Sequence, residues 1–111
     1  MDKLERYRDI IERNLKRIAA TWPRFQSVSA CTIFDRDTDH YLVVTEGWDK
    51  ARRIHQCVVH LEIVNGKIWI QEDLLEHGAA ADLEEAGVPK EDIVLGFYPP
   101  QVRPQTEYAA A

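Results

Sequence analysis

The sequence has little of what a membrane segment or a disulfide scaffold requires. Its apolar runs are only a few residues long, far short of the roughly 20 residues that a membrane-spanning helix needs. The charged start, MDKLERYR, lacks the apolar segment of a signal peptide. The two cysteines, Cys31 and Cys57, have no CxxC spacing, so we expect both to be reduced and buried as small apolar side chains. These absences predict a cytoplasmic protein that does not contact a membrane.

Positive charge is scarce, and it is scarcest in the second half of the chain. The net charge at pH 7 is −5. Residues 61–111 carry 3 Lys or Arg against 10 Asp or Glu, whereas residues 1–60 carry 11 against 9. Nucleic-acid-binding proteins usually present a basic patch that neutralises phosphates. The charge therefore argues against tight, non-specific DNA binding by this chain alone, and it favours a protein partner with a basic surface.

The sequence also lacks the short motifs of common enzyme classes. It has no GxSxG, no glycine-rich phosphate loop and no Ser/His/Asp set at a known spacing, so we expect no catalytic residue, no cofactor and no enzymatic activity. Lys67, Asp73 and Glu76 could together support a metal-assisted, nuclease-like hydrolase. Acids are also favoured at the start of a helix by its dipole. We favour this structural interpretation, and the hydrolase stays as an alternative.

His55, Cys57 and His60 are residue types that bind zinc. On an extended strand, positions 55 and 57 share one face and position 60 points to the other. The three side chains could converge only across a β-bulge, and a metal site needs several ligands at fixed distances. We therefore predict no metal site and expect structural or surface roles for these side chains.

Lys50, Arg52 and Arg53 form a compact basic cluster beside Trp48. Guanidinium groups bind phosphates or carboxylates, and an aromatic ring can stack on a base. Arg52, Arg53 and the N-terminal helix are therefore the basis of a second alternative, a direct DNA-binding module. Cations at an exposed turn and strand end give the same pattern, and this is the interpretation that we favour.

Apolar spacing of three and four residues predicts an N-terminal helix over residues 2–21. Asp2 is the expected N-cap, with Glu5 as its reciprocal partner. One stripe of this helix should face a core, and the charged face should be solvated. At 111 residues, the chain has room for one domain, which we expect to span residues 1–111.

After the helix the apolar period changes to two, which predicts strands. Asn65-Gly66 is a strong hairpin signal, and we expect the odd positions from Cys57 to Ile63 to pack on the helix. A short second helix and an irregular C-terminal segment should close the core. The predicted fold is α+β, with the N-terminal helix on a four-stranded antiparallel meander of residues 28–34, 40–46, 52–64 and 67–71, and the second helix over 76–86.

Several stretches of the sequence resemble one protein family. The longest is residues 47–71, GWDKARRIHQCVVHLEIVNGKIWIQ; the others are MDKLERYRDIIE, FDRDTDHYLVV, Glu76 and AGVPKEDIVLGFYPPQVRPQTEYA. Together they are similar to the XisI family, the fdxN-element excision controlling factors of cyanobacteria. The resemblance implies a small regulatory protein of DNA excision that works with a companion called XisH and a recombinase. It implies no catalytic mechanism.

We therefore predict a non-enzymatic accessory factor that controls site-specific excision of a DNA element by binding protein partners. Its contact with DNA would be indirect. Assembly into a homo-oligomer is left as an alternative. Reversal of Asp73 and Glu76 to lysine is expected to leave the fold intact and to slow partner binding. The candidate partner-binding residues are Trp48, Arg52, Arg53, His60, Asp73, Glu76 and Arg103.

Overall fold

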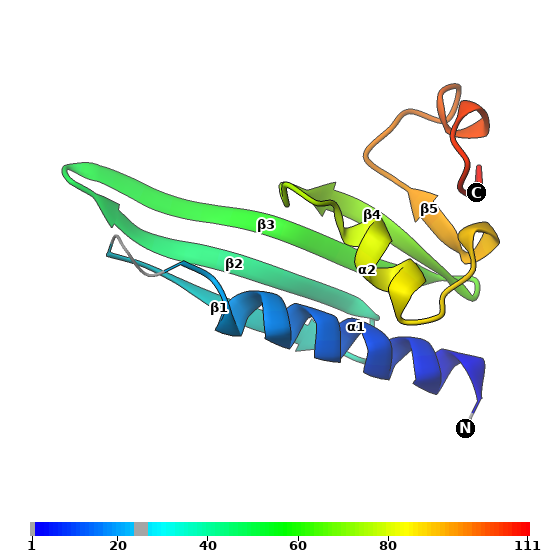
Figure 1. Cartoon of the computed structure of the whole chain (residues 1–111), viewed down its shortest axis with the longest axis horizontal. Coiled ribbons are helices and arrows are strands. Elements are labelled where there is room, and N and C mark those ends of the chain that lie inside the picture. Colours follow the sequence, from blue (N-terminus) through cyan, green and yellow to red (C-terminus); the bar gives the residue numbers. More distant parts are fainter. Residues whose placement is uncertain (1, 24–26) are drawn as a thin grey trace.

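The computed structural model describes residues 2–23 and 27–111 (Figure 1). A long N-terminal helix lies along one face of a β-sheet, and a short helix lies beside it (Figure 1). The prediction of an α+β fold is confirmed. The elements are α1 (Lys3–Ala20), β1 (Ser27–Asp35), β2 (His40–Asp49), β3 (Arg52–Val64), β4 (Lys67–Asp73), α2 (Ala79–Glu85) and β5 (Ile93–Leu95), with short 3-10 helices η1 (Lys90–Asp92) and η2 (Arg103–Gln105).

α1 forms where the sequence predicts a helix. Asp2 is its N-cap, and the Asp2 carboxylate accepts a hydrogen bond from the backbone N–H of Glu5 at 2.8 Å. The apolar stripe is buried, with Tyr7, Ile11 and Leu15 each no more than 1% exposed. Among the described residues, no helix combines the length and the apolar character needed to cross a membrane.

One arginine from the β1–β2 turn ties α1 to the sheet. Arg36 binds three carboxylates that follow one another along the helix, at 3.1 Å for Glu5, 3.0 Å for Asp9 and 2.7 Å for Glu12. Arg8 adds a second contact to the Glu5 carboxylate. Exposed ion pairs are individually weak, but this network fixes which side of α1 faces the β1–β2 hairpin.

The sheet has the order β1-β2-β3-β4-β5. Strands β1 to β4 pair antiparallel in sequence, so the predicted meander is confirmed. A fifth strand extends it, because β5 runs parallel to β4 with Ile93 beside Ile68 and Leu95 beside Ile70. Parallel neighbours need a crossover connection, and α2 lies within it. Three residues are too few to show a strand period, which is why the sequence predicts only an irregular segment there.

Both helices cover the same face of the sheet, which we call the inner face. Its strand side chains form a single core cluster with α1 and α2. Tyr41, Val43, Val59, Ile68 and Ile70 are completely buried in this cluster. The strands therefore alternate between side chains that face the helices and side chains that face away from them.

A β-bulge at Val58 changes which side chains of β3 face the helices. Val43 pairs with Val59, whereas the adjacent Val44 pairs with Cys57. An extra residue in one strand moves every position beyond it to the other face. The expected inner face of β3 is confirmed for the odd positions of 59–63, which are buried. It is wrong for Cys57, which the bulge turns away from α1.

α2 is capped by a carboxylate from outside the helix. Asp73, the last residue of β4, accepts hydrogen bonds from the backbone N–H groups of Ala79 at 2.7 Å and Leu75 at 3.1 Å. Gly78 is the N-cap residue of α2 and has no side chain to fill this role. Asp73 thus satisfies backbone donors that a helix start would otherwise leave unpaired.

The only buried carboxylate among the described residues joins the N-terminal helix to the C-terminal half. Asp92 is 8% exposed. Its carboxylate accepts a hydrogen bond from the Tyr7 hydroxyl and forms an ion pair with the Lys3 amine at 2.9 Å. Burial acts to raise the pKa of Asp92, but the contacts with Tyr7 and Lys3 outweigh burial and lower the pKa below its usual value. Burial and the same contact raise the pKa of Tyr7 to about 12.

Replacing Tyr7 with phenylalanine should lower the free energy of unfolding by about 1–3 kcal/mol at neutral pH, because Asp92 then loses a buried hydrogen-bond donor. The pKa of Asp92 is lowered in the folded state, so its stabilisation is present above the unfolded pKa and is lost as pH falls through the folded pKa. The stability difference between wild type and Tyr7→Phe, measured by urea unfolding, should therefore shrink in acid. A stability difference that stays the same in acid would contradict the role of Asp92 as the acceptor for Tyr7.

The Asp73 cap predicts that two neighbouring charge reversals act differently. Asp73→Lys should lower the free energy of unfolding by about 0.5–2 kcal/mol, as the loss of a helix cap does. Glu76→Lys should leave the thermal midpoint nearly unchanged, because Glu76 is exposed. Thermal unfolding of the two variants measures this, and equal midpoints would show that the Asp73 bonds do not contribute to stability.

Candidate functional site

The face of the sheet that points away from α1 and α2 carries three of the seven candidate partner-binding residues, Trp48, Arg53 and His60. We call it the outer face, and the strand pairing assigns side chains to it because paired residues share a face. Figure 1 shows both helices on one side of β1 to β3. The side chains of the outer face include Cys31, Ile33, His40, Leu42, Val44, Glu46, Trp48, Arg53, His55, Cys57, His60, Glu62, Trp69 and Glu72.

The β2–β3 turn carries the first of two tryptophan–arginine pairs. Trp48 is 50% exposed, and the Arg53 guanidinium lies over its ring at 5.3 Å from the centroid. Arg53 also donates to the backbone oxygen of Gly47 at 3.3 Å and pairs with Glu46 at 3.6 Å. Such contacts hold a large aromatic surface in one orientation. The predicted residues Trp48 and Arg53 are thus brought together.

The second tryptophan–arginine pair lies at the opposite end of the outer face. The Arg103 guanidinium from η2 lies over the Trp69 ring, 4.8 Å from its centroid, and donates to the backbone oxygen of Tyr98 at 3.0 Å. The C-terminal segment crosses β4 closely, since a Cβ on Gly96 would approach Gln71 Oε1 to 2.7 Å. This segment therefore covers the β4 end of the outer face.

Two histidines lie between these pairs. The Nδ1 of His40 and the Nε2 of His60 are 2.9 Å apart, and His40 Nε2 lies 3.5 Å from a Glu62 oxygen. Burial and the His40 imidazole lower the pKa of His60. His60 is therefore neutral at neutral pH and supplies a hydrogen-bonding group rather than a charge.

The bulge at Val58 corrects the expectation for the histidine–cysteine set. His60 pairs with Leu42 and Cys57 with Val44, so His55, Cys57 and His60 share the outer face instead of being divided between the two faces. Burial raises the pKa of the Cys57 thiol, and the Glu72 carboxylate adds to the effect. Among the residues that the structure describes, no group of three or more His, Cys, Asp or Glu side chains is placed to hold a metal ion.

An apolar band joins β1 to the middle of the outer face. Ile33 is 50% exposed and Leu42, its partner in β2, is half-buried. Cys31 is free and exposed, and Cys57 is free and half-buried. The prediction that both cysteines are buried is therefore wrong, because neither side chain faces the helices. The alternation in HYLVVTE (residues 40–46) could have indicated this band, since it divides β2 into two faces.

The remaining predicted residues lie away from the outer face or serve the fold. Arg52 pairs with Asp49 at 3.4 Å, and Asp73 caps α2. Glu76 is exposed in the segment before α2. Lys67 donates to the backbone oxygen of Ala111. The carboxylate of Asp73 and the amine of Lys67 are thus engaged in separate contacts, an arrangement that does not favour the hydrolase alternative.

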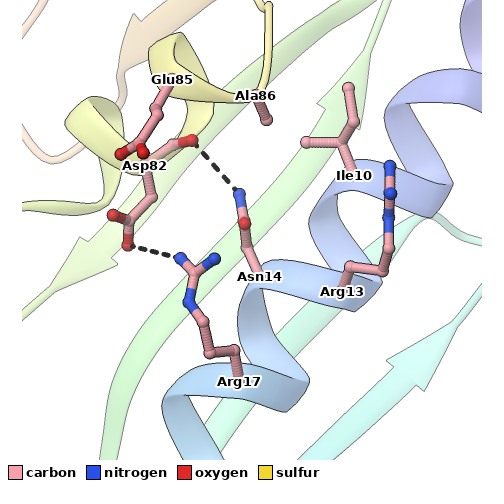
Figure 2. Close-up of a pocket in the computed structure, with 7 residues that line it drawn as sticks. All are labelled: Ile10, Arg13, Asn14, Arg17, Asp82, Glu85 and Ala86. Carbon is pink, nitrogen blue, oxygen red and sulfur yellow. Dashed lines mark hydrogen bonds and ion pairs between the residues drawn. The ribbon is translucent and has the colours of Figure 1, made fainter.

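A groove between α1 and α2 has a volume of about 330 Å³. Figure 2 shows Arg17 and Asn14 of α1 reaching toward Asp82 of α2, with contacts of 3.6 Å to the carboxylate and 3.5 Å to the backbone oxygen. The lining mixes Arg13 and Arg17 with Asp82 and Glu85. Charges of both signs give no preference for an anionic or a cationic ligand, and the contacts clamp the two helices together.

The chain matches the family model described as XisI protein over residues 1–110. A crystal structure of a XisI-like protein from Anabaena variabilis has a TM-score of 0.91 and 37% identity to this chain, over 97% of this chain and 99% of that chain. A crystal structure of the fdxN element excision controlling factor XisI from the same organism has a TM-score of 0.85 and 37% identity, over 99% and 100%. No curated protein matches. The resemblance in the sequence is confirmed, and the chain belongs to the XisI family.

Proposed function

We propose that this protein is a non-enzymatic accessory factor that controls excision of a DNA element by docking a protein companion on its outer face. Its membership of the XisI family and its likeness to an fdxN element excision controlling factor support a role in excision. The proposed companion is an XisH-like protein, and a site-specific recombinase is the component that the complex would regulate. The observation that carries the docking mode is the outer face, which neither α1 nor α2 covers and which has a tryptophan–arginine pair at each end.

The composition of the outer face is that of a protein-binding surface. Tryptophan and arginine are enriched among the residues that dominate binding energy, and Trp48 presents half of its surface beside the exposed Ile33. The rings are already fixed by Arg53 and Arg103. Binding therefore costs little further loss of side-chain freedom, which favours affinity.

Acidic residues on the same face favour a basic companion. Glu46 and Glu72 are exposed, and Glu62 is half-buried beside His40. A complementary positive surface would meet these carboxylates and would mainly raise the association rate. This local charge agrees with the acidic balance of residues 61–111.

The same contacts argue for indirect rather than direct DNA binding. Arg52 is paired with Asp49, and Arg53 with Glu46, so the cations of the β2–β3 turn are partly neutralised within the chain. A phosphate would have to compete with these carboxylates, and the net charge of −5 adds a repulsive field.

The test is complex formation with a co-expressed XisH-like companion. Trp48→Ala should weaken the complex about tenfold or more, because loss of an aromatic hot spot costs about 2 kcal/mol or more. Leu4→Ala is the control, since Leu4 is also exposed, at 39%, but lies on α1, on the helical side of the sheet. Titration calorimetry of purified proteins measures both dissociation constants.

Separate migration of the wild-type protein and the companion in gel filtration would reject the companion. If the complex forms but Trp48→Ala and Leu4→Ala bind equally well, the outer face is not the docking surface. Cleavage of plasmid DNA by the purified chain with magnesium, lost in the Lys67→Ala variant, would instead support the hydrolase alternative.

A further inference from the structure

β1 is an edge strand of the sheet. Among residues 2–23 and 27–111, it lies at the end of the strand order and pairs only with β2, so its other hydrogen-bonding edge has no strand partner there. Its nine residues, SVSACTIFD, contain no lysine, arginine or proline, and all nine pair with β2 in unbroken register. Natural proteins protect such edges with charges, proline, bulges or covering segments. β1 has a single charge, Asp35, at its end.

The other free edges of the same sheet carry the protection that β1 lacks. The edge of β5 is bridged by the C-terminal segment, where the N–H of Ala109 donates to the backbone oxygen of Ile93 at 2.9 Å. β3 extends beyond β4 from Arg52 to Val58, and this stretch begins with two arginines. The contrast within one molecule makes the edge of β1 the one most suited to pairing with a strand from another chain.

The sequence of β1 is complementary to itself when two copies run antiparallel. A pair centred on Cys31 places Val28 opposite Phe34 and Ala30 opposite Thr32 on the inner face. On the outer face, Cys31 lies opposite its own copy, and no position sets like charges against each other. Antiparallel pairing of identical strands is what a two-fold axis requires.

The position of α1 permits the same arrangement. It packs on β1 and β2 to a similar extent, so it lies over the inner face of these two strands rather than along the hydrogen-bonding edge of β1. The side of α1 toward β1 is marked by Arg36 bound to Glu12 and by Lys16 over the Phe34 ring.

We propose that two copies of this chain pair antiparallel through β1 to form a continuous ten-stranded sheet. The axis is perpendicular to the sheet, so both outer faces lie on one side and present two identical docking surfaces together. The dimer does not require a companion and is therefore testable on the chain alone, independently of the proposed function.

Sedimentation velocity of the wild-type chain, from low to high micromolar concentration, should show a species of twice the 12.8 kDa monomer mass. Cys31→Lys should be monomeric, because two lysines would face each other across the axis. Cys31→Glu should behave likewise, and a mixture of these two variants should recover the dimer. Gln56→Lys, an exposed position on β3, is the control and should leave the dimer intact.

Mild oxidation with copper phenanthroline should cross-link the wild-type dimer through Cys31, since opposed residues of antiparallel strands lie within reach of a disulfide. Cys57→Ser should cross-link and Cys31→Ser should not. The proposal is overturned if the wild type is monomeric at every concentration, or if Cys31→Lys remains dimeric. If the mixture of Cys31→Lys and Cys31→Glu stays monomeric, the two-fold register centred on Cys31 is wrong. A monomer whose β1 amides become protected only on binding the companion would assign the edge to that companion and equally overturn self-pairing.

Discussion

The structure depends on one constraint: the apolar stripe of α1 covers one face of the sheet, and the only other α-helix among the described residues lies on that same face. Burial of this stripe against Val43, Val59 and their neighbours is the main source of stability. The chain thus forms two layers, and the outer face has no layer of its own. The apolar and aromatic side chains on that face are left to contact the C-terminal segment, solvent or another protein.

The bulge at Val58 decides the chemistry of the uncovered face. By shifting the register of β3 against β2, it turns Cys57 outward and keeps Val59 inward. His60 then pairs in register with Leu42 and contacts His40. The outer face gains a polar centre between its two tryptophan–arginine pairs. A partner that recognises this face would meet hydrogen-bonding imidazoles flanked by aromatic anchors, which favours specificity as well as affinity.

The elements that rest on local signals could be predicted from the sequence. The Asp2 cap, the Asn65-Gly66 hairpin and the bounds of β3 depend on neighbouring residues, and each lies where the pattern indicates. The Asp73 cap, the bulge at Val58 and β5 depend on residues brought together from distant positions. No local period encodes them, so the sequence did not reveal the structural role of Asp73, and the expectation of a buried Cys57 was wrong.

The residues of the candidate site also differ in whether neighbouring or distant sequence positions bring them together. Trp48 and Arg53 are close in sequence and stack as the cluster suggested, whereas Arg103 finds Trp69 only because the C-terminal segment folds back over β4. The sequence does not predict His40 and Ile33 as site residues, because no motif or spacing marks a single exposed side chain. They become part of a surface only when the strand register places them beside Leu42 and His60.

The central claim is that the outer face, and not the helical side, is where this protein docks its companion. Hydroxyl-radical footprinting of the chain with and without an XisH-like companion tests it directly, because it reports the solvent exposure of individual side chains. The account predicts protection of Trp48 and Ile33 in the complex, with unchanged oxidation of Leu4 on α1, which is 39% exposed. Protection of Leu4 with unchanged Trp48 and Ile33 would contradict it.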